Sequence, residues 1–179
     1  MITVGGHTFD PTLITNGAII DIGCRQFDMA KHFPDKPVYC FDMAEEVFVN
    51  IPSNAICHKV AISDNAGDSA YYANGEGTCL QQIDPDQGHP FKPCKTITMD
   101  DVYAITGTDV DLLKLDCEGA EYIILGETFT PTPKQITVEF HHHCVPAMHM
   151  ANYQAIVERL SKDYTMHNDV WESRHGCGF

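Results

Sequence analysis

The sequence predicts an α/β fold in three layers, built on a doubly wound, mostly parallel sheet with an antiparallel edge. Short, nearly continuous apolar runs alternate along the chain with segments of helical periodicity, as in open sheets that helices cover on both faces. Such runs are typical of strands buried on both faces of a parallel sheet. The chain has no internal repeat and no interdomain linker, so residues 1–179 are expected to form a single domain.

In the first half of the chain, apolar runs with β-branched residues alternate with two short helical patterns. The expected strands cover residues 18–22, 38–41, 55–63 and 68–73. The expected helices cover residues 25–33 and 44–50. Pro34 and Pro52 end the two helical patterns, because proline cannot continue a helix. The turn at 64–67 joins the last two strands, which predicts a hairpin.

The second half begins after residues 74–93, a stretch rich in Gly, Pro and polar residues that is expected to be a functional or mobile loop. The strands expected beyond it cover residues 95–98, 111–116 and 135–141. The helices cover residues 99–105 and 119–126, and a last amphipathic helix carries the apolar stripe Tyr153, Ile156, Val157 and Leu160. Two strand-like segments, 164–167 and 171–178, then follow each other without a helix, which predicts the antiparallel pair at one edge.

The composition excludes several classes of function. The chain has 25 acidic and 11 basic side chains and a net charge of −14, which repels phosphate backbones and argues against nucleic acid as a partner. No apolar run approaches the roughly 18 residues that a membrane span needs, and the N-terminal residues lack the pattern of a signal peptide. We therefore expect a cytoplasmic protein. The cysteines show no CxxC spacing and are expected to be reduced and mostly buried; they are Cys24, Cys40, Cys57, Cys79, Cys94, Cys117, Cys144 and Cys177.

The first candidate site is the strand-to-helix turn at Asp21–Phe27. Gly23 allows close approach of a ligand to the backbone, and the start of the next helix offers free N–H groups. Asp42 ends the following strand, where an acidic side chain can accept hydrogen bonds from ribose hydroxyls. Two interpretations remain open, because Asp42 could equally cap the next helix.

The second candidate site is the block Leu113–Glu121, which gathers carboxylates where a strand ends and a helix begins. Glu118 and Glu121 could simply complement the dipole of that helix. This explanation does not extend to Asp116, which stands at the carboxyl end of the strand. Ligands of open α/β sheets bind beyond the carboxyl ends of the strands, so Asp116 is expected to face a cleft.

The third candidate site is the run Val138–Cys144. Alternation along a strand places Glu139, His141 and His143 on one face. Imidazole and carboxylate are both metal ligands, but successive histidines are awkward as a complete site and no second ligand cluster has standard spacing. We therefore expect no metal here and expect one or two histidines to line the cleft, with a metal site as the alternative.

Taken together, six segments from Ala18 to His141 resemble the FkbM family of methyltransferases. The segments read AIIDIG, VYCFD, KVAISDNAGDSAYY, KTITMDDV, DLLKLDCEGAEYIIL and ITVEFHH. The KLDCEGAE block is the most specific of them, because the family typically carries an Asp-x-Glu-Gly-Ala-Glu run there. The resemblance implies the Rossmann-like fold of class I methyltransferases and S-adenosylmethionine as cofactor.

The resemblance also implies roles for individual residues. The cofactor is expected to contact Asp21, Gly23, Arg25, Asp42, Met43, Ala61, Ile62 and Ser63. The residues expected to act on the acceptor are Asp116, Glu118, Glu139 and His141. An alcohol is a poor nucleophile until its proton is drawn away, so a base with a near-neutral pKa would help. His141 fits that role by position, with Glu139 or Asp116 orienting it or the substrate.

The chain departs from the family at the turn after the first strand. The family usually has a second glycine four residues after Gly23, where this sequence has Phe27, and Arg25 stands where small residues are usual.

Methylation of a hydroxyl on a sugar or small natural product is the expected function. The alternative is a degenerate, non-catalytic nucleoside-binding or structural domain. A nicotinamide-dependent enzyme is disfavoured, because GxGxxG is absent. The acceptor is not encoded recognisably, and the sequence is compatible with a homo-oligomer.

Overall fold

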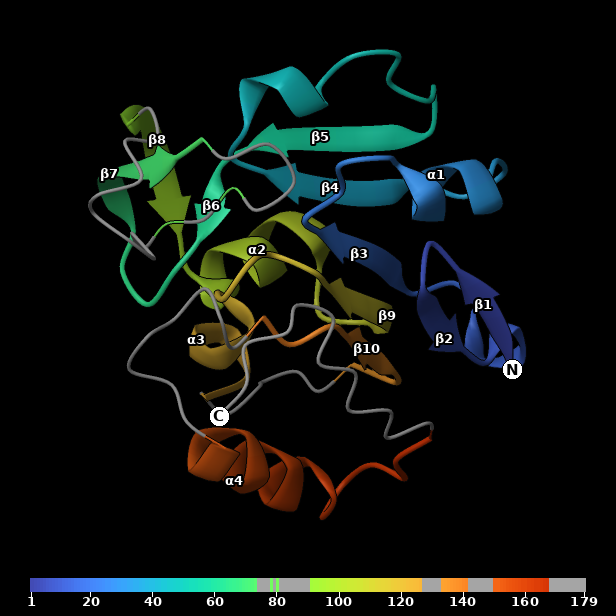
Figure 1. Ribbon diagram of the computed structural model, residues 1–179. Helices are drawn as coiled ribbons and strands as arrows, with labels where there is room; N and C mark the ends of the chain where they lie inside the picture. Colours follow the sequence, from blue (N-terminus) through green and yellow to red (C-terminus); the bar gives the residue numbers. More distant parts are fainter. Residues whose placement is uncertain (74–77, 79, 81–90, 127–132, 142–149, 168–179) are drawn as a thin grey trace.

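A five-stranded sheet forms the centre of the computed structural model, which describes residues 1–73, 78, 80, 91–126, 133–141 and 150–167 (Figure 1). Its strands are β3 (Ala18–Ile22), β4 (Val38–Asp42), β5 (Ala55–Lys59), β9 (Val110–Leu115) and β10 (Ile136–Val138). They pair in parallel in the order β10-β9-β3-β4-β5. The chain builds outward from β3 to β5 and then returns to the other side of β3. The winding therefore reverses between β3 and β9, the place where ligands of such sheets bind.

Helices and 3₁₀ turns cover this sheet. They are η1 (Pro11–Leu13), α1 (Asp28–His32), η2 (Glu45–Val47), α2 (Met99–Thr106), α3 (Glu121–Gly126) and α4 (Met150–Leu160). A capping box starts α2, in which the Thr98 hydroxyl accepts from the Asp101 N–H and the Asp101 carboxylate accepts from the Thr98 N–H. The helix ends at Gly107, whose φ of 84° lies in the left-handed region that favours glycine.

The sheet separates two apolar cores, which accounts for its nearly continuous hydrophobic strands. Side chains of β3 alternate between the faces, so Ile20 and Ile22 enter one core and Ile19 the other. The first core also contains residues of α2, α3 and α4, and the second contains residues of β2 (His7–Phe9), α1 and η2. Elements on both faces of a parallel sheet make three layers. The predicted doubly wound α/β fold is confirmed.

Two smaller sheets flank the main one, and both contain antiparallel pairs. The first is the hairpin of β1 (Ile2–Val4) and β2, which the sequence did not predict. The second has the order β6-β8-β7, with β6 (Ala61–Ile62), β7 (Gly67–Tyr72) and β8 (Phe91–Ile97). β8 therefore lies between the two strands that were expected to form a hairpin, and that prediction was wrong. The run 55–63 breaks at Val60, and its two parts join different sheets.

Other local predictions differ from the structure for identifiable reasons. The helix expected at 44–50 is reduced to the single turn η2, since so short a segment gains little from helix propensity alone. The helix expected from Arg25 begins only at Asp28, because Phe27 has a left-handed backbone conformation. Residues 164–167 form no strand; instead the Tyr164 hydroxyl donates to the Pro133 carbonyl at 2.8 Å. The other half of that predicted pair, 171–178, lies outside the described residues.

The cysteines and helices give two further results for the part of the chain that the structure describes. Five cysteines are free thiols, namely Cys24, Cys40, Cys57, Cys94 and Cys117. Burial raises the pKa of Cys57 to about 11, which leaves its thiol protonated. Within the same residues, no helix has the length and apolar character needed to cross a membrane.

Candidate functional site

A cavity of about 1190 Å³ opens beyond the carboxyl ends of β3, β4, β9 and β10. Its lining includes all but one of the predicted site residues: Asp21, Gly23, Arg25, Asp42, Met43, Ala61, Ile62, Asp116, Glu118, Glu139 and His141. Ser63 is the exception, and its hydroxyl donates to Asp64 at 3.0 Å. Small-molecule pockets commonly measure about 300–1,000 Å³, so this cavity has room for a large cofactor together with an acceptor.

Gly23 allows the loop after β3 to lie directly against the end of β9. Its φ is 79°, and a Cβ added there would overlap the backbone carbonyl oxygen of Asp116. Only glycine satisfies both the conformation and the close approach. The glycine therefore brings the first two candidate sites of the sequence into one cavity.

Lys114 joins the same two segments through its charge. It is 6% exposed near the carboxyl end of β9, and its Nζ lies 3.0 Å from Asp21 Oδ1 and 3.6 Å from Asp116 Oδ2. It also donates to the Gly23 carbonyl. Burial alone would lower the pKa of Lys114, but the charges of Asp21 and Asp116 outweigh it and raise the pKa. Lys114 is therefore a permanent positive charge beneath the cavity.

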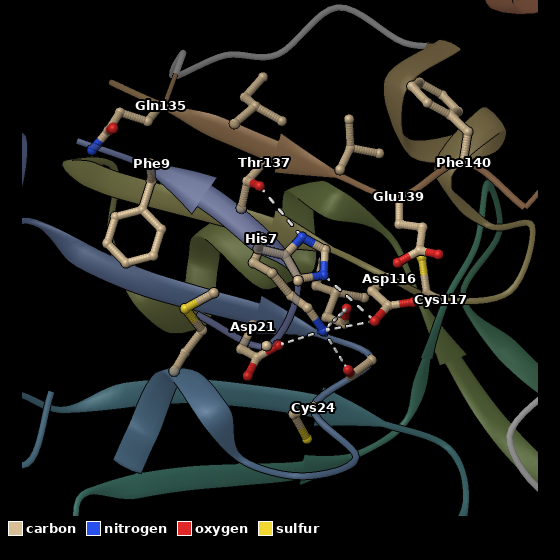
Figure 2. A pocket seen from close by; sticks show the side chains of 18 of the residues that line it. His7, Phe9, Asp21, Cys24, Asp116, Cys117, Gln135, Thr137, Glu139 and Phe140 are labelled. Carbon is tan, nitrogen blue, oxygen red and sulfur yellow. Dashed lines mark hydrogen bonds and ion pairs between the residues drawn. The ribbon is translucent and has the colours of Figure 1, made fainter. Parts of the chain in front are cut away.

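Asp116 lies close to both Lys114 and His7. Figure 2 shows the His7 ring directed toward Asp116. His7 Nε2 lies 3.5 Å from Asp116 Oδ2, and His7 Nδ1 lies 3.3 Å from the Thr137 hydroxyl. Burial would raise the pKa of Asp116, but the hydrogen bond from His7 and the charge of Lys114 lower it to about 2. Asp116 is therefore ionised at neutral pH and acts as an acceptor or a ligand.

His141 approaches Asp116 at the carboxylate oxygen that does not face His7 and Lys114. Its Nε2 lies 3.6 Å from Asp116 Oδ1 and 3.7 Å from Glu118 Oε1. Burial alone would lower the pKa of His141, but a hydrogen bond to Glu121 and the neighbouring carboxylates raise it to about 9. This differs from the near-neutral pKa expected of a general base. At neutral pH the ring is instead a cationic hydrogen-bond donor.

Glu121 fixes both His141 and the loop before α3. Its side chain is fully buried, and His141 Nδ1 lies 3.1 Å from its Oε1. The backbone N–H groups of Cys117 and Gly119 donate to the same carboxylate at 2.6 and 2.9 Å. Glu121 therefore makes specific hydrogen bonds to the loop and to His141, beyond the general interaction with a helix dipole that the sequence suggested. Glu118, in the middle of this loop, has a left-handed φ of 53°, a conformation that clusters at functional sites.

Asp42 shapes the turn before η2 but does not cap that helix, whose N-cap is Ala44. Its Oδ1 accepts the Ala44 N–H at 2.9 Å, which shapes the turn before η2. Its Oδ2 accepts no hydrogen bond from the residues that the structure describes, so it can serve a ligand. Burial raises the pKa of Asp42 to about 6. Buried apolar side chains line the cavity nearby, from Met43, Ala61 and Ile62.

Phe27 and Arg25, the two departures from the family, leave the turn intact. Phe27 has a φ of 55°, a conformation that glycine adopts most readily. Its ring is 3% exposed and packs in the second core, with its centroid 6.5 Å from that of Phe48. Arg25 is exposed at the edge of the cavity. Phe27 thus keeps the backbone shape that a glycine would give and adds a core side chain.

The sequence analysis did not assign three residues to the site: His7, Lys114 and Glu121. Lys114 had a usable signal, because a lysine inside an apolar strand must find buried partners. Glu121 was noticed only as a helix-start residue. His7 had no signal, since it reaches Asp116 from a hairpin 109 residues earlier in the chain. His143 lies outside the described residues.

Comparison with protein families gives a match over most of the chain. The family described as Methyltransferase FkbM domain matches residues 33–179. The match covers β4, β9 and β10 but begins after the Gly23 turn. No curated protein and no solved structure matches the chain.

Proposed function

The chain belongs to the FkbM methyltransferase family, and from that premise we propose that it is an S-adenosylmethionine-dependent O-methyltransferase. The acceptor in this proposal is a hydroxyl group of a sugar or small natural product. The observation that carries it is the meeting of Asp42, the Gly23 turn and Asp116 around one cavity at the reversal of the sheet. Asp42 and the Gly23 turn have expected roles in cofactor binding and Asp116 has one toward the acceptor, and the fold brings all three together.

The cofactor-binding half of the cavity would be formed by residues after β3 and β4. Asp42 Oδ2 would accept hydrogen bonds from the ribose hydroxyls. Met43, Ala61 and Ile62 would form the apolar wall for the adenine. Arg25 offers a positive charge to the carboxylate of the methionine part. The acidic side chains around Asp116 suit the positively charged sulfur. When bound, the cofactor supplies a methyl group that is already activated for transfer.

The acceptor-binding half would be formed by residues after β9 and β10. His141 donates a hydrogen bond to the acceptor hydroxyl, and Asp116 and Glu118 help to orient it toward the methyl group. Glu139 is the most exposed carboxylate near His141, with its Oε1 3.9 Å from Nε2, and it takes the hydroxyl proton. In the reaction the methyl carbon exchanges its bond to sulfur for a bond to the acceptor oxygen.

The setting that we propose is the cytoplasm, with a small molecule as acceptor. Five free thiols among the described residues are compatible with a reducing compartment. A net charge of −14 disfavours nucleic acid as an acceptor.

Titration calorimetry with S-adenosylhomocysteine tests the cofactor proposal. Asp42→Ala is expected to weaken binding by about 1–3 kcal/mol, because the ribose loses a charged acceptor. Asp42→Asn keeps an oxygen for the Ala44 N–H and separates loss of the turn from loss of the charge. Asp68→Ala removes an exposed carboxylate that pairs with Lys95 on β8, and should leave the affinity unchanged. Absence of binding by the unsubstituted protein at millimolar ligand would favour the degenerate, non-catalytic alternative.

A further inference from the structure

Metal-ligating atoms from two strand ends converge at one point of the cavity. They are Asp116 Oδ1, Glu118 Oε1 and His141 Nε2, and one ligand atom from each residue lies within 4.8 Å of the others. Ligands about 2.0–2.2 Å from one ion lie at most about 4.4 Å apart. The distances of 3.6 and 3.7 Å from His141 Nε2 already fall below that limit. The three side chains need to move little to share an ion.

We propose that Asp116, Glu118 and His141 bind a divalent metal ion of the Mn²⁺ and Zn²⁺ class, with Glu139 as a fourth ligand. One imidazole with two or three carboxylates is a donor set that these borderline ions accept. Glu139 lies beside the triad, with its Oε1 3.9 Å from His141 Nε2. Figure 2 shows the Glu139 side chain directed toward Asp116.

The buried Glu121 holds the His141 ring in the orientation that metal binding needs. Its carboxylate lies 3.1 Å from His141 Nδ1 and therefore accepts that N–H. The raised pKa of His141 keeps a proton on Nε2 in the metal-free protein, and binding of the ion would displace that proton. The neutral imidazole that results keeps its Nδ1–H on Glu121 and has its lone pair on Nε2, the atom that faces Asp116 and Glu118. Metal-binding histidines characteristically donate their other N–H to a carboxylate or carbonyl, which fixes the tautomer and the ring orientation.

A second group of possible ligands is formed by His7, Asp116 and Glu139, and it shares Asp116 with the first. Lys114 decides between the two groups. Its ammonium lies 3.6 Å from Asp116 Oδ2, the oxygen that also faces His7. A permanent positive charge at that distance repels a cation. The geometry therefore favours the side of Oδ1, with His7 and Lys114 holding the other oxygen of Asp116 in place.

The existence of the site depends on the geometry alone, whereas its role depends on the proposed function. A cation bound here would face the acceptor-binding half of the cavity. With the ion in place, His141 and Asp116 would be its ligands, and the ion would hold the acceptor hydroxyl in place of the direct hydrogen bond from His141. A hydroxyl bound to a divalent ion loses its proton more easily, so the ion would activate the acceptor oxygen.

The test is a titration of the cofactor-free protein with Mn²⁺. Binding is measured by electron paramagnetic resonance, as a loss of the signal of the free ion. One ion per chain is expected, and Zn²⁺ should displace it. Asp116→Asn and His141→Gln should abolish this binding, and Glu121→Gln should weaken it by about 10–100-fold, the usual effect of losing an outer-shell partner. Asp42→Asn changes a carboxylate of the same cavity outside the triad and should bind as the unsubstituted protein does.

Two results would overturn the metal site: no binding of either ion, or binding that persists in both Asp116→Asn and His141→Gln. Far-UV circular dichroism of each variant shows whether a loss of binding comes from a loss of fold. Because the titration contains no cofactor, its failure leaves the proposed methyl transfer standing. Failure to bind S-adenosylhomocysteine would in turn leave the metal site standing.

Discussion

Gly23→Ala is expected to destabilise the protein by about 2–5 kcal/mol. A left-handed residue other than glycine costs about 1–2 kcal/mol, and forcing extra atoms into a packed region adds about 1–3 kcal/mol. The added Cβ would overlap the carbonyl oxygen of Asp116, so the loop after β3 and the end of β9 would have to separate. Because these two segments line the same cavity, the substitution should also weaken S-adenosylhomocysteine binding. Urea denaturation and calorimetry measure the two effects.

Gly107→Ala is the matched control for this substitution. Gly107 has a similar φ of 84°, but a Cβ there meets nothing within 4 Å. Gly107→Ala should cost only the conformational part of the folding free energy, about 1–3 kcal/mol, and leave ligand binding unchanged. Equal destabilisation by the two substitutions would contradict the close approach of the two segments.

Asp116→Asn and His141→Gln are each expected to lower the rate of methyl transfer by about 10²-fold or more, the scale of effects on positioned proton donors and acceptors. The two side chains approach within 3.6 Å at the acceptor-binding half of the cavity. The hydrogen bonds of these two side chains also contribute about 1–3 kcal/mol to the free energy of folding. Each substitution should therefore lower the melting temperature by between a few degrees and about 10 °C. The assay is transfer of a labelled methyl group, with a panel of hydroxylated compounds as acceptors.

Glu45→Gln serves as the control for this pair, because it changes an exposed carboxylate on η2 that pairs with Lys59, away from the cavity. Its rate should equal that of the unsubstituted protein. Normal transfer by either Asp116→Asn or His141→Gln would exclude that residue from the proposed machinery.

The main sheet could be predicted from the sequence because its strands are buried on both faces. Val110–Leu115, for example, is buried at every position, and its four apolar residues mark the strand in spite of the charged Asp111 and Lys114 between them. The β6-β8-β7 sheet could not be predicted, because β6 has only two residues and pairs with β8, which lies far along the chain. The turn at 64–67 suggested that β6 and β7 pair with each other, but both pair with β8 instead.

The site was predictable where its residues follow a buried strand. Asp42 and Asp116 were found in this way, because the carboxyl ends of parallel strands share one edge of the sheet. His7 belongs to a separate hairpin, and only the tertiary fold brings it to Asp116. The raised pKa of His141 was equally hidden, because it depends on the buried Glu121, 20 residues earlier in the chain.

A crystal structure of the complex with S-adenosylhomocysteine tests the central claim most directly. The account predicts the ribose hydroxyls within hydrogen-bond distance of Asp42 Oδ2, the adenine against Met43 and Ile62, and the sulfur directed toward Asp116. A ligand bound elsewhere, or a cavity that stays empty of it at millimolar concentration while Asp42 retains its present position, would contradict the assignment of this protein as an S-adenosylmethionine-dependent methyltransferase.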